Sequence, residues 1–378
     1  MSELNYLEKL LDGTEVEWKA LGDVTSVLRG KRLTKNLLSA EEKFPVFHGG
    51  LEPLGYYNKS NRPANTVMII NVGASAGTVG YSTVDFWSSD GCFCLEHNEL
   101  LNNRFLYFAL IGYQSLLKSK VRVAGIPTLD AIVVNKLLIP IPCPENPEKS
   151  LAIQSKIVRI LDRFSALTAE LTAELTAELN MRKKQYNYYR DQLLNLEGRE
   201  NTREMRIGDI YDFQYGTGNT IPKSGGQYPV YGSNGIVGSH DKYNSEDSPV
   251  IGHIGAYAGI VNWGQGKHFV TYNGVICRHK SKEVLQKYAY YLLLLQDFGS
   301  KSNSASQPFV SYNILNAPIV LVPPLQEQAR IVAILDKFDT LTNSITEGLP
   351  REIELRQKQY EYYRDLLFNF PKPETVSK

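Results

Sequence analysis

The sequence lacks the features that mark several large classes of protein. It has four cysteines in 378 residues and no CxxC pair, so no cysteine-based zinc site is indicated and we expect reduced, structural thiols. Its longest apolar run, Tyr288–Leu295, is far too short to span a bilayer, and no signal-peptide pattern opens the chain. We therefore expect a cytoplasmic protein without a metal site.

The chain also lacks a strong net charge and the motifs of nucleotide chemistry. Lys and Arg number 41 against 40 acidic residues, so any nucleic-acid surface must rest on local charge. No GxxxxGK[ST] phosphate loop is present, because Gly264–His268 has neither the glycine spacing nor the Ser/Thr. Phe213–Gly218 is interpreted as a surface turn, and Pro323-Pro324 lacks the following aromatic residue of an amino-methyltransferase motif. These absences favour a protein without a catalytic site.

The positive feature of the sequence is a long internal repeat. The segment Ile157–Leu196 returns as Ile331–Phe370, 174 residues later, and 21 of the 40 positions are identical. Both copies contain ILD followed by phenylalanine, and both contain QYxYYRD, at Gln185–Asp191 and Gln359–Asp365. A duplicated long segment predicts an object with internal two-fold symmetry, such as a protein that reads two half-sites.

Each copy of the repeat has the pattern of a long helix. Apolar residues recur at spacings of three, four and seven, which gives one apolar stripe. Two such stripes are buried most simply by packing on each other as an antiparallel intramolecular coiled coil, and 40 residues form a rod of roughly 60 Å. The first copy reads TAEL three times within Leu167–Leu179. The second contains Gly348-Leu349-Pro350, where we predict a kink or break, because proline removes a helix hydrogen bond.

The rest of the chain, residues 1–150 and 199–325, has short β-rich runs and many glycine turns. These two stretches are distantly alike, and each ends in a proline-rich, strand-like exit before its long helix. The matching segments are Leu21–Val24 with Ile207–Ile210, Phe44–Phe47 with Tyr228–Tyr231, and Gly73–Gly77 with Gly255–Gly259. We therefore predict an α+β chain: globular domains 1–150 and 199–325, helices 151–198 and 326–372, and a tail 373–378.

The first residues add a further similarity. Tyr6–Asp12 reads like Tyr189–Asn195, as if the chain began with the end of a third helix that the C-terminal helix completes in space. Seven residues do not decide between this circular arrangement and a chance match, and both alternatives stay open.

The repeat, the TAEL array and the shared ILD and QYxYYRD blocks together resemble the DNA specificity subunit of type I restriction-modification systems. The resemblance covers almost the whole chain, and the array is similar to the length-variable spacer of one subfamily. It implies two target recognition domains, each reading one half of a bipartite, asymmetric DNA sequence across an unread gap.

The same resemblance implies partners and places the chemistry in them. It implies a non-catalytic subunit that docks two modification subunits, which methylate adenine using S-adenosylmethionine, and two restriction subunits, which cleave DNA with ATP. S-adenosylmethionine, ATP and Mg would belong to these partners, and no cofactor is expected in this chain.

The TAEL array is interpreted as a ruler for the gap. Four residues of α-helix add about 6 Å and a net rotation of roughly 40°, whereas one base pair of DNA adds about 3.4 Å and roughly 35°. Because a recognition domain must face its groove, we expect rotation to dominate, so that deleting one TAEL shortens the gap by one base pair and leaves both half-sites unchanged. The alternative is a solvated helix face of incidental length, in which Glu170, Glu174 and Glu178 supply helix propensity.

Local charge and glycine-rich turns select candidate DNA contacts. Such contacts require cations for phosphates and polar side chains for base edges, and glycines let the backbone approach a groove. Residues 17–64 hold eight Lys/Arg against five acids, and residues 267–301 hold six against two. The candidates are Arg29, Lys31, Arg32, Lys35, His48, Lys59, Asn61 and Arg62 in the first domain, and Lys223, Tyr231, Ser233, Asn234, His240 and Lys242 in the second. The alternative for each is an ordinary surface residue, and recognition loops follow no code that names the bases.

The tyrosine blocks supply candidate partner contacts. Neighbouring helical positions diverge by about 100°, so the tyrosines of one block cannot all face one seam. Aromatic residues with a polar tip are enriched in interfaces, and we expect Tyr188, Arg190, Tyr362 and Arg364 to dock the modification subunits. The alternative is packing against the recognition domains. Two competing functions are a coiled-coil adaptor that binds only proteins and a nucleic-acid enzyme.

Overall fold

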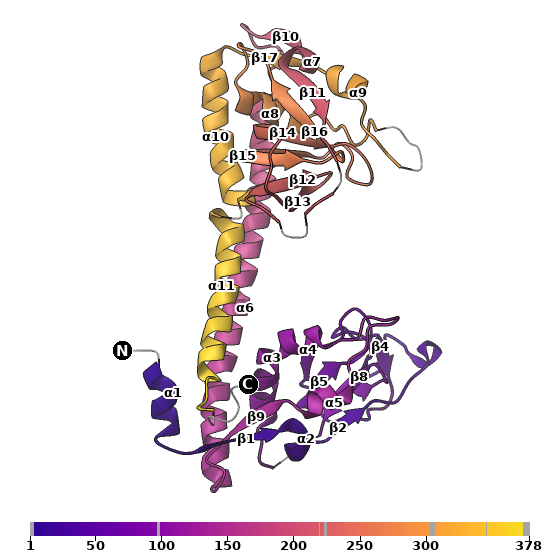
Figure 1. The fold of residues 1–378 in the computed structure, drawn as a ribbon, viewed down its shortest axis with the longest axis vertical. Coiled ribbons are helices and arrows are strands. Elements are labelled where there is room, and N and C mark those ends of the chain that lie inside the picture. Colours follow the sequence, from indigo (N-terminus) through magenta and orange to yellow (C-terminus); the bar gives the residue numbers. More distant parts are fainter. Residues whose placement is uncertain are drawn as a thin grey trace. The chain divides into compact units, whose positions relative to one another are not determined.

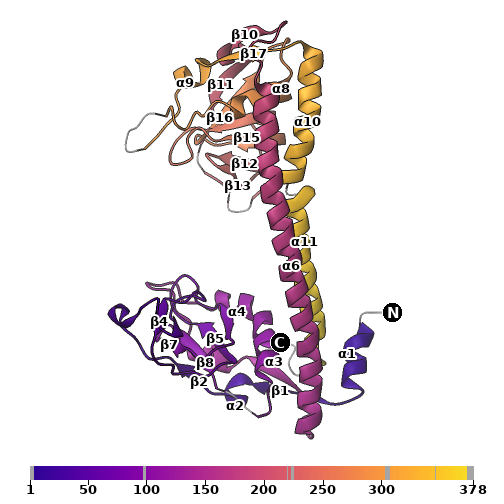
Figure 2. The same ribbon diagram turned by 180° about the vertical axis from the view of Figure 1, so that it is seen from behind.

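The computed structural model of the chain describes residues 4–96, 99–218, 220–222, 225–302, 307–344 and 346–372. The chain divides into two compact units, Met1–Glu174 with Ile353–Lys378, and Leu175–Glu352, which we describe one at a time. Each unit combines one β-rich domain with segments of both helical repeat copies (Figures 1 and 2).

The domain of the first unit contains three small sheets. Its elements are α1 (Leu4–Leu11), β1 (Val16–Ala20), α2 (Leu21–Val24), β2 (Val27–Arg29), the 3-10 helix η1 (Lys35–Leu37), β3 (Phe44–Phe47), β4 (Gly55–Tyr57), β5 (Thr66–Ile70), β6 (Val79–Ser82), β7 (Trp87–Ser88), β8 (Cys92–Leu95), α3 (Asn103–Gly112), α4 (Gln114–Ser119), α5 (Ala131–Asn135) and β9 (Leu138–Pro142). Strand β1 pairs antiparallel with the exit strand β9, and the other sheets have the orders β2-β8-β5-β6 and β4-β3-β7. Strands β3 and β7 are parallel.

The second unit joins most of its strands into one sheet. Its elements are β10 (Arg203–Arg206), α7 (Ile207–Ile210), β11 (Tyr211–Tyr215), β12 (Tyr228–Gly232), β13 (Gly235–His240), β14 (Ser245–Gly252), β15 (Val261–Val270), β16 (Gly274–His279), α8 (Gln286–Leu294), α9 (Tyr312–Asn316) and β17 (Ile319–Val322). The six-stranded sheet has the order β11-β16-β14-β15-β12-β13, and β10 pairs antiparallel with the exit strand β17.

The two domains share one pairing scheme, which confirms the distant likeness of their sequences. The series β2-β8-β5-β6 corresponds to β11-β16-β14-β15, and the parallel pair β3–β7 corresponds to β12–β15. The matched tetrapeptides form α2 and α7, each directly after the first strand. The fold is therefore the predicted α+β repeat, with each domain opening and closing on one two-stranded ribbon.

The repeat copies form the long helices α6 (Pro147–Leu194), α10 (Leu325–Asn343) and α11 (Gly348–Leu367). In the first unit, Phe164 of α6 stacks on Tyr363 of α11 with 5.4 Å between ring centroids. In the second, Tyr189 of α6 stacks on Phe338 of α10 at 5.7 Å. The early part of α6 thus meets the end of the second copy and its late part meets the beginning, so the predicted antiparallel pairing is confirmed. None of the helices in the described ranges is long and apolar enough to cross a membrane.

Helix α6 begins four residues before the predicted start, for a reason that the sequence contains. The side-chain oxygen of Asn146 accepts a hydrogen bond from the amide of Lys149 at 3.0 Å, and Pro147 takes the first helical position. Asparagine as a cap followed by proline is a strong helix-start signal, since that proline has no amide to leave unpaired. The helix ends at Leu194.

The predicted break in the second copy is confirmed, and it lies just before the proline. Helix α10 ends at Asn343 and α11 begins at Gly348, so Pro350 stands in the first turn of a new helix, where proline is tolerated. Gly348 has φ +76°, and a Cβ there would lie 2.5 Å from the Thr340 carbonyl oxygen. Glycine is therefore required for this close approach to the end of α10.

One hydrophobic core holds each domain to its helices. In the first unit, Ile157 and Leu161 of α6 lie in the same core as Ile139 and Phe105 of the domain. Leu7 of α1 and Leu367 of α11 join that core, and residues of both ends line a common cavity of ≈ 400 Å³. The first and last helices therefore pack in one unit, as the circular arrangement requires.

Candidate functional site

Four basic candidates of the first domain gather around the turn between β7 and β8. The Arg29 Nε donates to the Asp90 carbonyl at 3.1 Å, and the His48 Nδ1 lies 3.3 Å from the Asp90 carboxylate. Arg32 and Lys35 line a shallow cavity of ≈ 290 Å³ together with His48 and Asp90. The structure thus brings together residues that are up to 61 positions apart, and the side chains of Arg29, Arg32 and Lys35 are exposed.

The other candidates of this domain have different surroundings. Asn61 bonds the backbone of Ser88 on both sides, because its Nδ2 donates to the carbonyl at 3.0 Å and its Oδ1 accepts from the amide at 2.7 Å. Asn61 therefore pins the preceding loop to β7. Arg62 donates to the Asn61 carbonyl at 2.8 Å, while its Nε is buried without a hydrogen-bond partner. Lys31 and Lys59 are exposed.

In the second domain, the predicted glycine turn is a tight hairpin between β12 and β13. Gly232 pairs with Gly235, so the loop consists of Ser233 and the exposed Asn234. Gly235, directly after this loop, has φ +78°, a left-handed conformation that glycine adopts without strain. A Cβ on Gly252 would lie 2.4 Å from the Ser233 carbonyl oxygen, so the hairpin is seated against the end of β14.

The remaining candidates of this domain divide between core and surface. Tyr231 is 6% exposed, and its hydroxyl donates to the Trp263 carbonyl at 3.2 Å, so it supports the hairpin from the core. His240 stacks on Phe269 at 4.8 Å, and its Nδ1 accepts from the Lys242 amide at 2.9 Å. The same Nδ1 lies 2.7 Å from the carboxylate of the neighbouring Asp241. Lys242 is exposed, and Lys223 lies outside the described residues.

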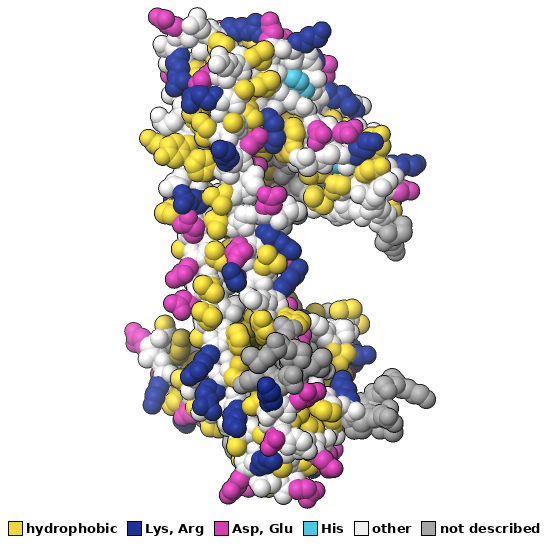
Figure 3. Space-filling view, turned by 90° about the vertical axis from the view of Figure 1, so that its left-hand side faces the viewer, with side chains coloured by type: hydrophobic (Ala, Val, Ile, Leu, Met, Phe, Trp, Pro, Cys, Tyr) yellow, Lys and Arg dark blue, Asp and Glu magenta, His cyan; other side chains and the backbone are white. Residues whose placement is uncertain are grey.

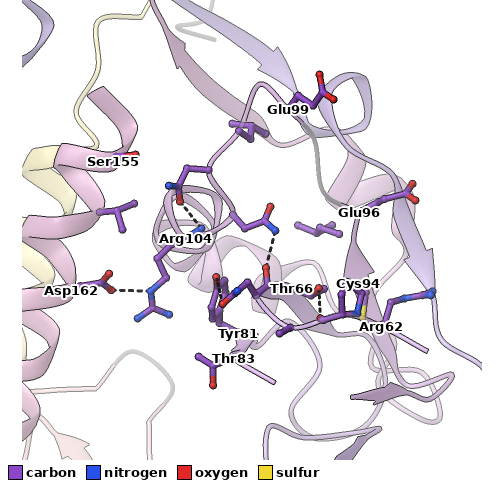
Figure 4. A pocket seen from close by; sticks show the side chains of 18 of the residues that line it. Arg62, Thr66, Tyr81, Thr83, Cys94, Glu96, Glu99, Arg104, Ser155 and Asp162 are labelled. Atoms are coloured by element: carbon purple, nitrogen blue, oxygen red, sulfur yellow. Dashed lines mark hydrogen bonds and ion pairs between the residues drawn. The ribbon is translucent and has the colours of Figure 1, made fainter. Parts of the chain in front are cut away.

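An ion pair on aromatic rings attaches the first domain to α6, and sequence reasoning missed it. Arg104 of α3 donates to Asp162 of α6 at 2.8 Å, and Tyr81 lies beside this pair (Figure 4). The guanidinium carbon of Arg104 lies 4.8 Å from the ring centroid of Tyr81 and 4.8 Å from that of Tyr107. Burial raises the pKa of both tyrosines, and the Arg104 charge opposes that rise. Tyr81, Arg104 and Asp162 border a cavity of ≈ 1550 Å³ between the sheet and α6.

The second domain has the equivalent joint at the equivalent helix position. Lys287 of α8 lies 3.7 Å from Asp336 of α10 and 4.1 Å from the Trp263 ring centroid. The Tyr291 hydroxyl donates to Asp336, and burial together with that bond raises the Tyr291 pKa. Asp162 and Asp336 are the aspartates of the two ILD blocks, so the repeated sequence carries the joint.

A buried glutamine completes each joint. Gln154 is fully buried in α6; its Oε1 accepts from the Asn102 amide at 2.8 Å, and its Nε2 donates to the Leu100 carbonyl at 2.9 Å. Gln328 of α10 accepts from the Leu285 amide at 2.8 Å. Both amides stand at the start of a domain helix, α3 or α8. The 174-residue repeat spacing of these two glutamines was the signal that could have found them.

The tyrosine blocks divide into inward and outward members, as helical geometry predicted. Tyr186 is 6% exposed, whereas Tyr188 is 61% and Tyr362 is 51% exposed. Arg190 and Arg364 are largely covered, and each pairs with the aspartate that follows it. The face in Figure 3 shows Lys and Arg interspersed with Asp and Glu, with no broad field of one sign. Among the residues described, no cluster of His, Cys, Asp and Glu could hold a metal.

Comparison with known proteins identifies the family. The chain matches the family described as type I restriction modification DNA specificity domain twice, over residues 14–181 and 199–355. This chain belongs to that family. The EcoR124I/EcoR124II specificity subunit of Escherichia coli is 39% identical over 423 aligned positions, covering 100% of both chains. The EcoprrI specificity subunit of the same species is 37% identical and covers 92% of this chain and 93% of the relative.

Solved structures show the same fold for the specificity subunit. A type I restriction-modification S subunit from M. genitalium aligns with a TM-score of 0.52 at 21% identity and covers 96% of this chain and 98% of its own. A chain from a structure on assembly and conformational transition of the type I system aligns with a TM-score of 0.55 at 17% identity and covers 93% and 97%. The protein is thus a non-catalytic DNA specificity subunit, and the catalytic cofactors belong to the other subunits of its complex.

Proposed function

We propose that the two domains of this specificity subunit, residues 1–150 and 199–325, each read one half of a bipartite, asymmetric DNA target. The observation that carries the proposal is the pair of equivalent joints, at Gln154 and Asp162 in one unit and at Gln328 and Asp336 in the other. Two different recognition domains that are attached at equivalent helix positions suit a target with two different halves. Helical segments 151–198 and 326–372 then set the unread gap; residues 373–378, assigned as a tail from the sequence, lie outside the described residues.

The proposed contacts to DNA are those that the sequence selected. The cluster around Asp90 supports this assignment, because three exposed cations and His48 lie together there, and the Ser233-Asn234 hairpin supports it in the second domain. The full proposed set is Arg29, Lys31, Arg32, Lys35, His48, Lys59, Asn61, Arg62, Lys223, Tyr231, Ser233, Asn234, His240 and Lys242. Within it, Asn61 and Tyr231 act by positioning their loops, because their polar atoms are bonded to backbone.

The TAEL array is proposed to be the ruler of the gap. It stands in the middle of the continuous helix α6, after Asp162 and before Tyr186, so its length changes the number of residues between the two attachment points. Deleting Thr172–Leu175 removes one unit, and we expect the gap of the methylated motif to shorten by one base pair with both half-sites unchanged. An unchanged gap, or altered half-sites, would refute the ruler.

The exposed tyrosines of the helices are proposed to dock partners. Tyr188 and Tyr362 occupy equivalent positions, and Arg190 and Arg364 lie two residues further on, so two copies of one partner would find the same surface twice. We assign these surfaces to two modification subunits, with two restriction subunits completing a cytoplasmic complex. Changing Tyr188 and Tyr362 to alanine should abolish co-purification with the modification subunit; retained binding would reject the assignment.

One experiment tests the central proposal. The chain is coexpressed with the modification subunit of its own system, and methylated adenines are mapped in genomic DNA by single-molecule sequencing. We expect one bipartite motif with methylation on both strands, which gives both half-sites and the gap. If an assembled complex produced no motif, the function would move to an adaptor that binds only proteins.

A further inference from the structure

We propose that the hairpin after α4, residues 120–128, reads thymine in the first half-site. Its exposed apolar side chains, Val123 and Ile126, would pack against thymine methyl groups in the major groove. This inference rests on the proposed reading of one half-site by the first domain. Local charge and glycine-rich turns selected the candidates in the sequence, and they did not select this hairpin. The feature that distinguishes the hairpin is its exposed apolar surface, which only the structure shows.

The exposure of these two side chains is the first observation. Val123 is 80% and Ile126 is 71% exposed, the two highest values among the large hydrophobic residues that the structure describes. An isolated exposed aliphatic residue needs no explanation, but two at the tip of one ordered hairpin form a small apolar surface. A protein that reads base edges has a use for such a surface, since the thymine C5-methyl is the apolar group of the major groove.

The hairpin is held firmly at its base. Arg122 and Thr128 exchange backbone hydrogen bonds of 2.9 and 3.0 Å, and the Thr128 hydroxyl donates to the Ile126 carbonyl at 2.9 Å. Gly125 has φ +84° at the tip, with open space around its Cβ position. The Pro127 carbonyl accepts from the Gly73 amide at 2.9 Å, which fastens the hairpin to the domain. The base of the hairpin is therefore fixed, which lowers the conformational entropy that the tip loses on binding.

The charge and place of the hairpin fit DNA. Lys118, Lys120 and Arg122 are exposed within or beside it, and no acidic residue occurs in 118–126. Arg122 pairs with Asp130 at 2.9 Å, so two cations are left for phosphates. The backbone connects the hairpin to the basic cluster, because Asn71 joins Leu129 on one side and Gly91 on the other, at 2.9 and 3.1 Å. Gly91 in turn donates to His48.

The second domain has a matching backbone contact, and the sequence that precedes it differs. The Gly255 amide donates to the Pro308 carbonyl at 2.8 Å, as Gly73 does to Pro127, and both glycines open the repeated Gly-Ala-x-Ala-Gly turn. The loop before Pro308 reads GSKSNSASQ and contains no large apolar residue. A common backbone contact beside different sequences is what two domains need if these sequences read different bases.

The test combines protein variants with a change in the DNA. The wild-type chain, a Val123→Ser/Ile126→Ser variant and a control, Val84→Ser, are each coexpressed with the modification subunit. Val84 is 52% exposed in the same domain and lies outside the hairpin. The methylated motif is mapped for each complex. Binding is then measured with duplexes in which each thymine of the first half-site is replaced in turn by uracil, which lacks only the methyl group.

We expect the wild type and the control to bind at least one uracil duplex roughly fourfold more weakly, the ratio for one buried methyl group. The double variant should show no thymine preference there, and its motif should be relaxed at that position in the first half-site only. An unchanged motif with an unchanged uracil ratio would overturn the proposal, and so would a first half-site without an A·T pair. Failure of the variant to assemble would assign the tip to a subunit interface instead. If the wild type itself produced no bipartite motif, the proposed function would fail before the variants were compared.

Discussion

The two joints between domain and helix differ on one side only. On the helix side, both units use a buried glutamine and the aspartate of ILD, at Gln154 and Asp162 or at Gln328 and Asp336. On the domain side, Arg104 is replaced by Lys287 and Phe108 by Tyr291. A cation, aromatic rings beside it and a helix-start amide are thus the features that the two domains share at this joint.

This difference separates two kinds of constraint. The helix side is fixed by residues of a repeated sequence, whereas the domain side keeps a chemistry and lets its residues vary. The joint does not depend on strong charge coupling: the Arg104 and Asp162 side chains are 31% and 42% exposed, and such pairs contribute about 0.2–1 kcal/mol. The bonds of the buried glutamine, which water cannot replace, therefore contribute more to the joint than the ion pair does.

The strongest test of this equivalence is to remove either glutamine. Gln328→Ala leaves the Leu285 amide and the Pro323 carbonyl without their partner, and Gln154→Ala does the same to groups at Leu100 and Asn102. Since an unpaired buried polar group costs about 1–3 kcal/mol, we expect each variant to lose about 2–4 kcal/mol in free energy of unfolding. Urea denaturation followed by circular dichroism measures both.

The exposed Gln326, two positions from Gln328, provides the control. Gln326→Ala should change the free energy of unfolding by less than about 0.5 kcal/mol. A large loss for only one of the two buried glutamines would show that the joints are not equivalent.

A smaller effect is expected at the helix break, where the two copies differ most. Gly348→Ala places a Cβ at φ +76° and 2.5 Å from the Thr340 carbonyl oxygen, so we expect a loss of about 1–2 kcal/mol in free energy of unfolding. The repeat-equivalent residue Glu174 is inside α6 and exposed, and Glu174→Ala should be neutral within about 0.5 kcal/mol. Thermal unfolding compares the two, and a Gly348→Ala variant as stable as the wild type would mean that the break has another cause.

The smallest effect concerns an aromatic exchange between the cores, and it depends on pH. Tyr288 of α8 corresponds to Phe105 of α3, and the Tyr288 hydroxyl is buried without a hydrogen-bond partner. Burial raises the pKa of Tyr288, so the stability that its neutral form contributes is complete below the ordinary tyrosine pKa of about 10 and is lost as the pH rises above it.

Tyr288→Phe should therefore be neutral or slightly stabilising at pH 8, and it should gain about 1 kcal/mol more over the wild type by pH 11. Urea denaturation at both pH values measures this gain. The reverse exchange, Phe105→Tyr, is the matched control and should make the first unit sensitive to alkali. A Tyr288→Phe variant that lost the same stability between pH 8 and pH 11 as the wild type would contradict the assignment.

The sequence predicted the parts of the fold that repeat. Identity over Ile157–Leu196 and Ile331–Phe370 led directly to paired antiparallel helices, and the fixed φ of Pro350 located the break. The short matches Leu21–Val24 and Ile207–Ile210 correctly indicated two related domains. These signals are local or periodic, so they can be recognised in a single sequence without the structure.

The site was less predictable, because its members meet only through tertiary pairing. Asp90 contacts Arg29 and His48, which come from distant segments of the chain. Nothing in the sequence indicates that the side-chain oxygen and nitrogen of Asn61 both form hydrogen bonds with the backbone of Ser88. Gln154 was inside the long helix and looked like any polar residue of a solvated face, although it is fully buried. The repeat spacing marks it as shared without revealing what it contacts.

The interruption between α10 and α11 makes the two antiparallel helical stretches unequal in how they respond to a change of length. Helix α6 runs without interruption through its TAEL units, whereas residues at the corresponding place in the second copy leave the helical conformation before Gly348. Each residue that is inserted into a continuous helix rotates and shifts everything that follows it in that helix. A non-helical connection has no helical register that an insertion would disturb. If the TAEL array is the proposed ruler, α6 therefore gains or loses a unit without requiring a matching helical insertion in the second copy.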